Sequence, residues 1–338
     1  MTERALARTL STLVALALAA CSSSPEPSFT PNPAPGGNGG SSAGSGGSGG
    51  VGGFGGGGAP VGGAAGSGGI SIGIDAGGLA GGTSTCGTKD VTALFVIDRS
   101  GSMKCNLPPT TASADCERTP ERADPNLPSK WEVVTDVLAK SFESLVPKVE
   151  GLTVRAGLSF FSVDDECGAR SQPSIPIAAV DSAQVDLLRQ SLSITPAGGT
   201  PIVGATILAY KHIYQPSFTG EGHVILLSDG ADSCKPAYDL SVGPADHVAG
   251  LIDVEAPKAL RLGIKTWVIG APGSEPARHM LSNLARAGGT ARKDCDPGSD
   301  DDPSSGNCHY DMTQGDFQVA LEAALKQIVS VVTCQPPA

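Results

Sequence analysis

The sequence is poor in aromatic residues and in positive charge. Of its 338 residues only 4% are aromatic, and 23 Lys and Arg stand against 34 Asp and Glu, which gives a formal net charge of −11. A nucleic-acid-binding protein needs a basic face to displace counterions from phosphates. The composition therefore argues against nucleic acid as a partner and against peripheral adhesion to anionic lipid. It fits a solvated exported protein or a cation binder, and solubility alone is the simpler explanation.

Sequence patterns of common metal and catalytic sites are also missing. No cysteine pair has C-x-x-C spacing, no histidine pair has H-E-x-x-H spacing, and no phosphate-binding P-loop is present. The segment Ser100-Gly101-Ser102 does not indicate a nucleophile, because no base is placed to activate it. We therefore expect that the protein is not an enzyme.

The first twenty residues have the pattern of a targeting segment. Arg4 and Arg8 introduce an apolar run that carries no charge until Glu26, and the run is shorter than the roughly 20 apolar residues of a permanent membrane span. It ends in Leu-Ala-Ala-Cys21, which resembles the lipobox of bacterial lipoproteins. The resemblance implies a signal peptide over 1–20 and acylation of Cys21. An ordinary signal peptide with a cysteine at its cleavage site is the alternative.

Residues 21–85, from the acylated cysteine onward, form a Gly, Ser and Pro-rich stretch with few apolar side chains. Such a composition buries too little apolar surface to offset chain entropy, so we expect a disordered tether. It is either a leash that lets a domain reach away from the membrane or a tolerated low-complexity insertion. Lipid attachment would place the protein in the bacterial cell envelope, exported and anchored to a membrane, at the periplasmic face or the cell surface.

Eight cysteines remain when Cys21 is set aside. An even number in an exported chain is typical of disulfides, although sequence alone does not fix their connectivity. Two pairs would each close a short polar insertion, one pair brackets the domain, and one pair is left over. The candidate pairs are Cys105–Cys116, Cys295–Cys308, Cys86–Cys334 and Cys167–Cys234.

Apolar runs that are typical of buried strands alternate with segments of helical periodicity from about residue 86 to residue 335. Strands are predicted at 91–97, 152–161, 223–227 and 264–269, and helices at 130–146, 181–192, 201–214, 256–262, 276–286 and 315–332. This alternation predicts one α/β domain with a doubly wound, mostly parallel sheet and helices on both faces. Such folds bind ligands beyond the carboxyl ends of their strands.

Three polar motifs are placed to meet at that edge of the sheet. Asp98-Arg99-Ser100-Gly101-Ser102 follows the first strand, Gly198-Gly199-Thr200-Pro201 opens a helix, and Ser228-Asp229-Gly230 follows a central strand. Their types, order and spacing resemble the metal-ion-dependent adhesion site of von Willebrand factor type A domains. The resemblance covers residues 86–335 and implies a von Willebrand factor A-like, Rossmann-like fold. Alone, the first motif is equally typical of a helix cap.

The resemblance implies a ligand set for a divalent cation. Ser100, Ser102 and Thr200 would be direct ligands, and Asp98 and Asp229 would bind directly or through water. These are hard oxygen donors, which suit Mg²⁺, with Mn²⁺ or Ca²⁺ as alternatives. Because few carboxylates bind the cation directly, an acidic side chain of a protein partner would complete its shell.

The sequence therefore predicts a membrane-tethered, extracytoplasmic binding or adhesion module that captures a protein partner through a divalent cation. A structural envelope lipoprotein with a purely stabilising metal is the main alternative. A metal-dependent hydrolase is a weaker one, since no general base is evident beyond the ligands. Met103, Lys104 and Cys105 follow Ser102, so the carboxylates that build a second metal site in integrin β subunits are absent. The polar insertion 104–129 either sets specificity at the edge of the site or is a passive disulfide-closed loop.

Overall fold

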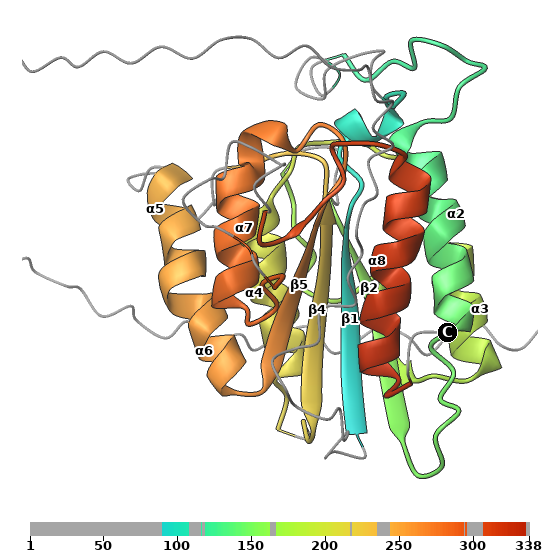
Figure 1. Cartoon of the computed structure of the whole chain (residues 1–338), viewed down its shortest axis with the longest axis vertical. Coiled ribbons are helices and arrows are strands. Elements are labelled where there is room, and N and C mark those ends of the chain that lie inside the picture. The colour runs from blue at the N-terminus through green and yellow to red at the C-terminus, as the bar shows by residue number, and fades with distance from the viewer. Residues whose placement is uncertain are drawn as a thin grey trace, which may run out of the picture. The chain divides into compact units, whose positions relative to one another are not determined.

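The computed structural model describes residues 90–107, 116, 119–162, 167–216, 218–234, 244–293, 295 and 307–335. Within them lies a six-stranded sheet with the strand order β3-β2-β1-β4-β5-β6 and helices on both faces (Figure 1). The predicted α/β class, with a doubly wound and mostly parallel sheet, is confirmed. The predictions for the signal peptide, Cys21 and the tether lie outside the described residues, as does Cys86.

Every strand pair is parallel except β2–β3, which is antiparallel at one edge of the sheet. The strands are β1 (Asp90–Asp98), β2 (Thr153–Phe161), β3 (Ile175–Ala179), β4 (Glu221–Ser228), β5 (Ile264–Gly270) and β6 (Tyr310–Asp311). β1 is central, and every residue from Val91 to Asp98 is buried. A strand covered on both faces has no solvent side, which explains why its sequence is a continuous apolar run.

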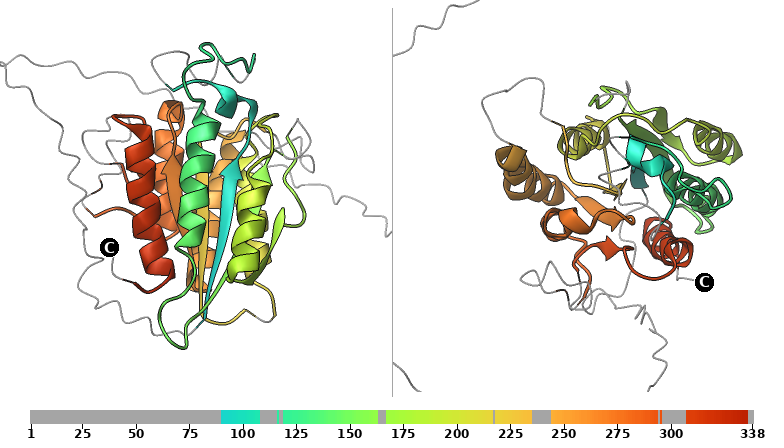
Figure 2. Two further views of the ribbon diagram at one scale, coloured as in Figure 1. Left: turned by 90° about the vertical axis from the view of Figure 1, so that its right-hand side faces the viewer. Right: turned by 90° about the horizontal axis from the view of Figure 1, so that it is seen from above.

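Two hydrophobic cores lie on opposite faces of the sheet, and alternate residues of β1 belong to each. Phe95 and Ile97 pack among α2, α3 and α8, whereas Leu94 and Val96 pack among α4, α6 and α7. Figure 2 shows α2, α3 and α8 together in front of the sheet in its left view. The helices are α2 (Lys130–Glu143), α3 (Ser182–Ser191), α4 (Ile202–Ile213), α5 (Pro244–Ala249), α6 (Ala256–Arg261), α7 (Arg278–Ala287) and α8 (Phe317–Val332).

Short or irregular elements account for the differences from the sequence prediction. β3, β6 and α5 were not predicted, and the helix expected from residue 256 is preceded by α5 and a π-helical turn, Gly250–Glu255. Pro257 stands at the start of α6, where it has no N–H to donate and its ring crowds the carbonyl four residues before. A wider turn at this point accommodates the proline. Two 3₁₀ turns, Gly101–Lys104 (η1) and Glu275–Ala277 (η3), complete the elements.

Disulfides join Cys105 to Cys116, Cys167 to Cys234 and Cys295 to Cys308, which are three of the four candidate pairs. The first closes part of the insertion 104–129. Within that insertion the Asn106 amide donates to the backbone carbonyls of Asp124, Leu127 and Pro128, and its Oδ1 accepts from the Asp124 N–H. The segment that leads into α2 is therefore held by side-chain bonds as well as by a disulfide.

Candidate metal centre

The three polar motifs meet at the carboxyl ends of β1 and β4. These strands are parallel neighbours, Ile97 lies opposite Leu227, and Asp98 and Ser228 are the last residues of the two strands. The chain then turns into η1 after β1 and into the segment Asp229–Cys234 after β4. Because both strands end at the same edge, the motif that follows each one is brought into one place, at the upper end of the sheet in Figure 1.

A chain of hydrogen bonds connects the two aspartates. Asp98 Oδ1 accepts from the Ser100 N–H at 2.8 Å, and Asp98 Oδ2 accepts from the Ser228 hydroxyl at 2.6 Å. The Ser100 and Ser102 hydroxyl oxygens lie 2.9 Å apart, and Ser102 Oγ donates to Asp229 Oδ1 at 2.8 Å. The predicted ligands of the first and third motifs are therefore in one connected group, and Asp98, Ser100 and Asp229 are each 0% exposed.

The backbone of the second motif is attached to the first motif and to the segment that follows the third. The Gly101 N–H donates to the Gly198 carbonyl at 2.8 Å, and the Thr200 N–H donates to Ser233 Oγ at 2.9 Å. Thr200 is 1% exposed, and a methyl group added to Gly230 would lie 3.9 Å from Thr200 Oγ1. The Thr200 hydroxyl therefore lies beside the segment that carries Asp229. All five predicted site residues gather at one edge of the sheet.

The strand order and the mostly parallel sheet agree with the von Willebrand factor A-like fold that the sequence resemblance implies. No family model matches the chain, and no curated protein matches it.

Solved structures with similar architecture include a pilus adhesin, SpaC from Lactobacillus rhamnosus GG, which is 15% identical. It covers 73% of this chain, this chain covers 31% of it, and the TM-score is 0.48. A von Willebrand factor type A protein from Catenulispora acidiphila is 14% identical, with 72% and 43% of the two chains covered and a TM-score of 0.43. Proximal thread matrix protein 1 from the mussel byssus, with a zinc-occupied metal-ion-dependent adhesion site, is 15% identical, with 72% and 48% covered and a TM-score of 0.41. This chain spans about a third of the length of the adhesin.

Burial and the neighbouring carboxylate determine the electrostatics of the candidate centre. Burial and, after it, the charge of Asp229 raise the pKa of Asp98 to about 7, although hydrogen bonds from Ser228 and Ser100 lower it. Hydrogen bonds alone therefore compensate the charge of Asp98 poorly. A divalent cation would favour the ionised form of Asp98.

The donor set of the centre fits a hard cation. Two carboxylates and three hydroxyls offer only oxygen, which Mg²⁺, Mn²⁺ and Ca²⁺ prefer. No group of three or more His, Cys, Asp or Glu side chains that could hold a metal ion occurs in the part of the chain that the structure describes. A metal at this edge would therefore depend on the hydroxyls of Ser100, Ser102 and Thr200.

Lys130 is a member of the site that sequence reasoning missed. Its Nζ forms a buried ion pair with Asp229 Oδ2 and donates to the Pro272 carbonyl at 3.2 Å. The sequence prediction identified residue 130 only as the start of a helix. A signal was present, because the first turn of a helix disfavours a cation. A lysine at this position therefore suggests an anionic partner elsewhere in the fold.

Two other charged residues fix the loops and were not predicted. The Arg99 guanidinium is buried and donates to the Ser162 carbonyl and, at 2.7 Å, to the Thr195 carbonyl. Asp232 accepts from the Val203 N–H at 2.7 Å and so caps the first turn of α4, which has no cap from its own residue Pro201. Both contacts tie the Thr200 loop to segments that are distant in the sequence.

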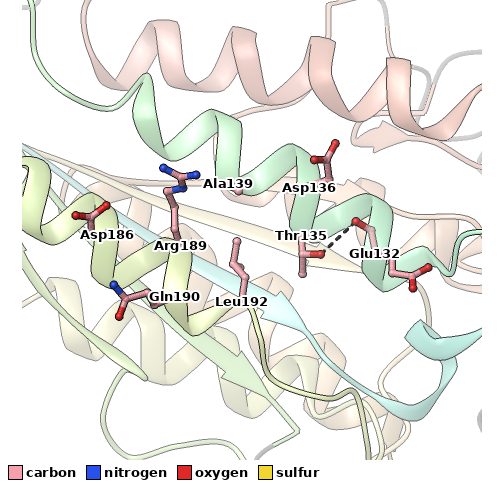
Figure 3. Close-up of a pocket in the computed structure, with 8 residues that line it drawn as sticks. All are labelled: Glu132, Thr135, Asp136, Ala139, Asp186, Arg189, Gln190 and Leu192. Carbon is pink, nitrogen blue, oxygen red and sulfur yellow. Dashed lines mark hydrogen bonds between the residues drawn. The ribbon is translucent and has the colours of Figure 1, made fainter.

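A surface groove lies elsewhere, between α2 and α3 (Figure 3). Its volume is about 680 Å³, and its lining includes Asp136, Asp186 and Arg189. Thr135 Oγ1 donates to the Glu132 carbonyl at 3.1 Å within it. None of the five predicted metal-site residues lines this groove, so it does not enlarge the candidate centre.

Proposed function

We propose that this domain binds a divalent cation through Asp98, Ser100, Ser102, Thr200 and Asp229 and captures a protein partner through that cation. The partner would offer an acidic side chain to the metal. Mg²⁺ is the cation that we expect, with Mn²⁺ and Ca²⁺ able to take the same oxygen donors.

The observation that carries the proposal is the buried network between Asp98 and Asp229. Two carboxylates lie in one hydrogen-bonded group with the Ser100 and Ser102 hydroxyls, at the carboxyl ends of neighbouring parallel strands. Buried carboxylates that share a site repel each other, and the charge of Asp229 raises the pKa of Asp98 even though Lys130 pairs with Asp229. Neutral hydroxyls add oxygen ligands without adding negative charge, which leaves a bound cation able to attract a further carboxylate.

The rest of the chain supports a tethered module. The lipobox-like sequence before Cys21 and the Gly and Ser-rich stretch up to residue 85 fit an acylated leash that places the domain at the bacterial cell envelope. In the described part of the chain, none of the helices is both long enough and apolar enough to cross a bilayer. On the lipobox-like sequence we propose that acyl groups on Cys21 hold the protein at a membrane.

A metal that only stabilises the three loops is the second candidate function. It is favoured by the burial of the site, since Asp98, Ser100 and Asp229 are 0% exposed and Thr200 is 1% exposed. Under this alternative the cation raises stability but has no open position for a partner. An acidic ligand distinguishes the two functions, because only an accessible metal exchanges a bound water for a carboxylate.

The test is calorimetric titration of Mg²⁺ and Mn²⁺ into the oxidised protein and into Asp98→Ala. We expect one site in the parent and a loss of at least about tenfold in affinity in the variant, since one of two site carboxylates is removed. Asp186→Ala, at an exposed carboxylate on α3, is the matched control and should bind as the parent does. Equal binding by Asp98→Ala would exclude the proposed centre.

The partner step is tested on the Mn²⁺-loaded protein by water-proton relaxation. Acetate, or a short peptide that contains glutamate, should displace a metal-bound water and lower the relaxation enhancement. A metal that binds and raises the melting temperature, but whose relaxation does not respond to carboxylates, would establish the purely structural role instead.

A further inference from the structure

Lys130 forms a buried ion pair with a candidate metal ligand, Asp229. Its side chain is 2% exposed, and its Nζ contacts Asp229 Oδ2 and the Pro272 carbonyl. A buried lysine loses hydration that only a close anion can replace. The charge of Lys130 therefore belongs to the metal centre. Lys140, on the same helix, is exposed.

Several contacts hold the ammonium group in this place. The Lys130 N–H donates to the Cys105 carbonyl at 2.9 Å, and Ser129 and Glu132 form a capping box that fixes the start of α2. On the other side, the Ala271 N–H donates to the Ser228 carbonyl at 2.8 Å, which places Pro272 beside the end of β4. The lysine is thus fixed at its backbone by the insertion and at its tip by the loop after β5.

The two carboxylate oxygens of Asp229 contact different partners. Oδ2 faces Lys130, while Oδ1 accepts from Ser102 Oγ at 2.8 Å, on the side of the Asp98 network. Only Oδ1 therefore lies toward the hydroxyls that would surround a cation. Lys130 also cancels one of the two negative charges of the centre, so a divalent ion that enters adds more charge than the remaining carboxylate neutralises.

We propose that Lys130 makes the metal-loaded centre net positive, so that it weakens cation binding and strengthens the capture of a single carboxylate. The inference rests on the proposed function and names the residue that sets its selectivity for an acidic ligand. In the metal-free protein, the same ammonium group compensates Asp229. In the loaded protein, a surplus positive charge in a buried site favours an anion as the last ligand.

The experiment compares the oxidised parent with Lys130→Met, which keeps the length of the side chain and removes its charge. We expect Mn²⁺ to bind Lys130→Met on the order of tenfold more tightly by calorimetry. We also expect acetate to bind the Mn²⁺-saturated variant on the order of tenfold more weakly by water-proton relaxation. Lys130→Arg keeps the charge and should lie closer to the parent than Lys130→Met in both measurements. Lys140→Met is the matched control on the same helix and should change neither.

Each result decides between the two levels of the proposal. Mn²⁺ binding that is equal in the parent and in Lys130→Met overturns the role of Lys130 and leaves the metal centre standing. If neither protein binds Mn²⁺, both proposals fail. Mn²⁺ binding that appears only in Lys130→Met supports the lysine as a cation that competes with the metal. It overturns the proposal that the parent protein binds the metal. General damage to the fold would weaken both ligands, so only the opposite shifts support the proposal. Lys130→Gln replaces Lys130→Met if circular dichroism shows that the latter does not fold.

Discussion

At the scale of single residues, His223 shows how burial determines the response of this domain to acid. Its ring is 1% exposed, Nδ1 accepts from Trp267 Nε1 at 3.0 Å, and Nε2 lies 3.6 Å from Glu221 Oε1. The pKa of His223 is lowered to about 4, mainly by burial. The charge of Glu221 raises this pKa, and that of Lys265 lowers it. The folded protein therefore keeps the imidazole neutral at pH values where the unfolded chain takes up a proton.

This pKa predicts a loss of stability between pH 6.5 and pH 4. The unfolded state binds more protons in that window, so the free energy of unfolding falls as the pH falls. A single histidine with these two pKa values contributes a loss of about 2 kcal/mol between pH 7 and pH 5. Urea unfolding of His223→Gln, measured beside the parent in the presence of a chelator, should show a loss smaller by about that amount. Parallel pH profiles of the two proteins would refute the assignment.

The sequence predicts only those residues of the site that belong to recognisable motifs. The three motifs were noticed because two follow buried strands and one opens a helix, and their resemblance to a metal-ion-dependent adhesion site then implied the ligand set. That set is Asp98, Ser100, Ser102, Thr200 and Asp229. Lys130 and Asp232 were not noticed, because a lysine at a helix start and an aspartate in a loop are ordinary surface residues in a sequence. Their roles arise from contacts across 99 and 29 positions of the chain, and no local pattern encodes such contacts.

At the scale of elements, the long helices and central strands followed from periodicity, and the short elements did not. β6 has two residues, Tyr310 and Asp311, and joins the sheet through Ile269 and Gly270 of β5. Two residues cannot display an alternation. β3 is a half-exposed edge strand that contains Pro176, a residue that lowers any strand prediction although edges tolerate it. Both elements depend on a neighbouring strand that supplies the hydrogen bonds.

The disulfide Cys167–Cys234 links the element that follows β2 to the segment that follows β4, and it lies against the Thr200 loop. A methyl group on Gly199 would lie 3.1 Å from both sulfur atoms, and Ser233 exchanges two hydrogen bonds with the backbone of Thr200. Replacing both cysteines with serine should cost roughly 4 kcal/mol of stability for a separation of 67 residues. It should also weaken Mn²⁺ binding several-fold, because Thr200 loses its support.

The double variant of Cys295 and Cys308 is the matched control. That disulfide has a separation of 13 residues and adjoins His309, whose Nδ1 lies 2.9 Å from the Ser282 hydroxyl of α7. Its loss should lower the melting temperature while the Mn²⁺ affinity measured by calorimetry stays unchanged. Equal effects of both double variants on Mn²⁺ affinity would show that the Cys167–Cys234 bond stabilises the domain generally and has no particular role at the loop.

At the scale of the whole molecule, the fold buries two carboxylates, Asp98 and Asp229, in one network at the end of the sheet. The strands bury Asp98 and Asp229 completely, and burial with mutual repulsion raises the pKa of Asp98 to about 7. In the absence of a cation, Asp98 therefore lowers the free energy of unfolding as the pH rises from about 4 to about 7, because the unfolded chain releases its proton first. Sites of this kind are retained for function, because stability alone would favour their removal.

Asp98→Asn tests this conflict on the whole domain. Asparagine keeps an oxygen for the Ser100 N–H and removes the charge, so at pH 7.5 with a chelator its melting temperature should equal or exceed that of the parent. A cation at a hundred times its dissociation constant adds about 2.7 kcal/mol to the parent, which raises its melting temperature by roughly 5–10 °C. A tenfold weaker affinity should cut that gain to about half or less in Asp98→Asn. Scanning calorimetry with and without Mn²⁺ measures both effects. The opposite result would be an Asp98→Asn variant that is less stable than the parent without metal. It would mean that Asp98 contributes to the packing of the sheet edge and that its charge is not kept for binding a cation.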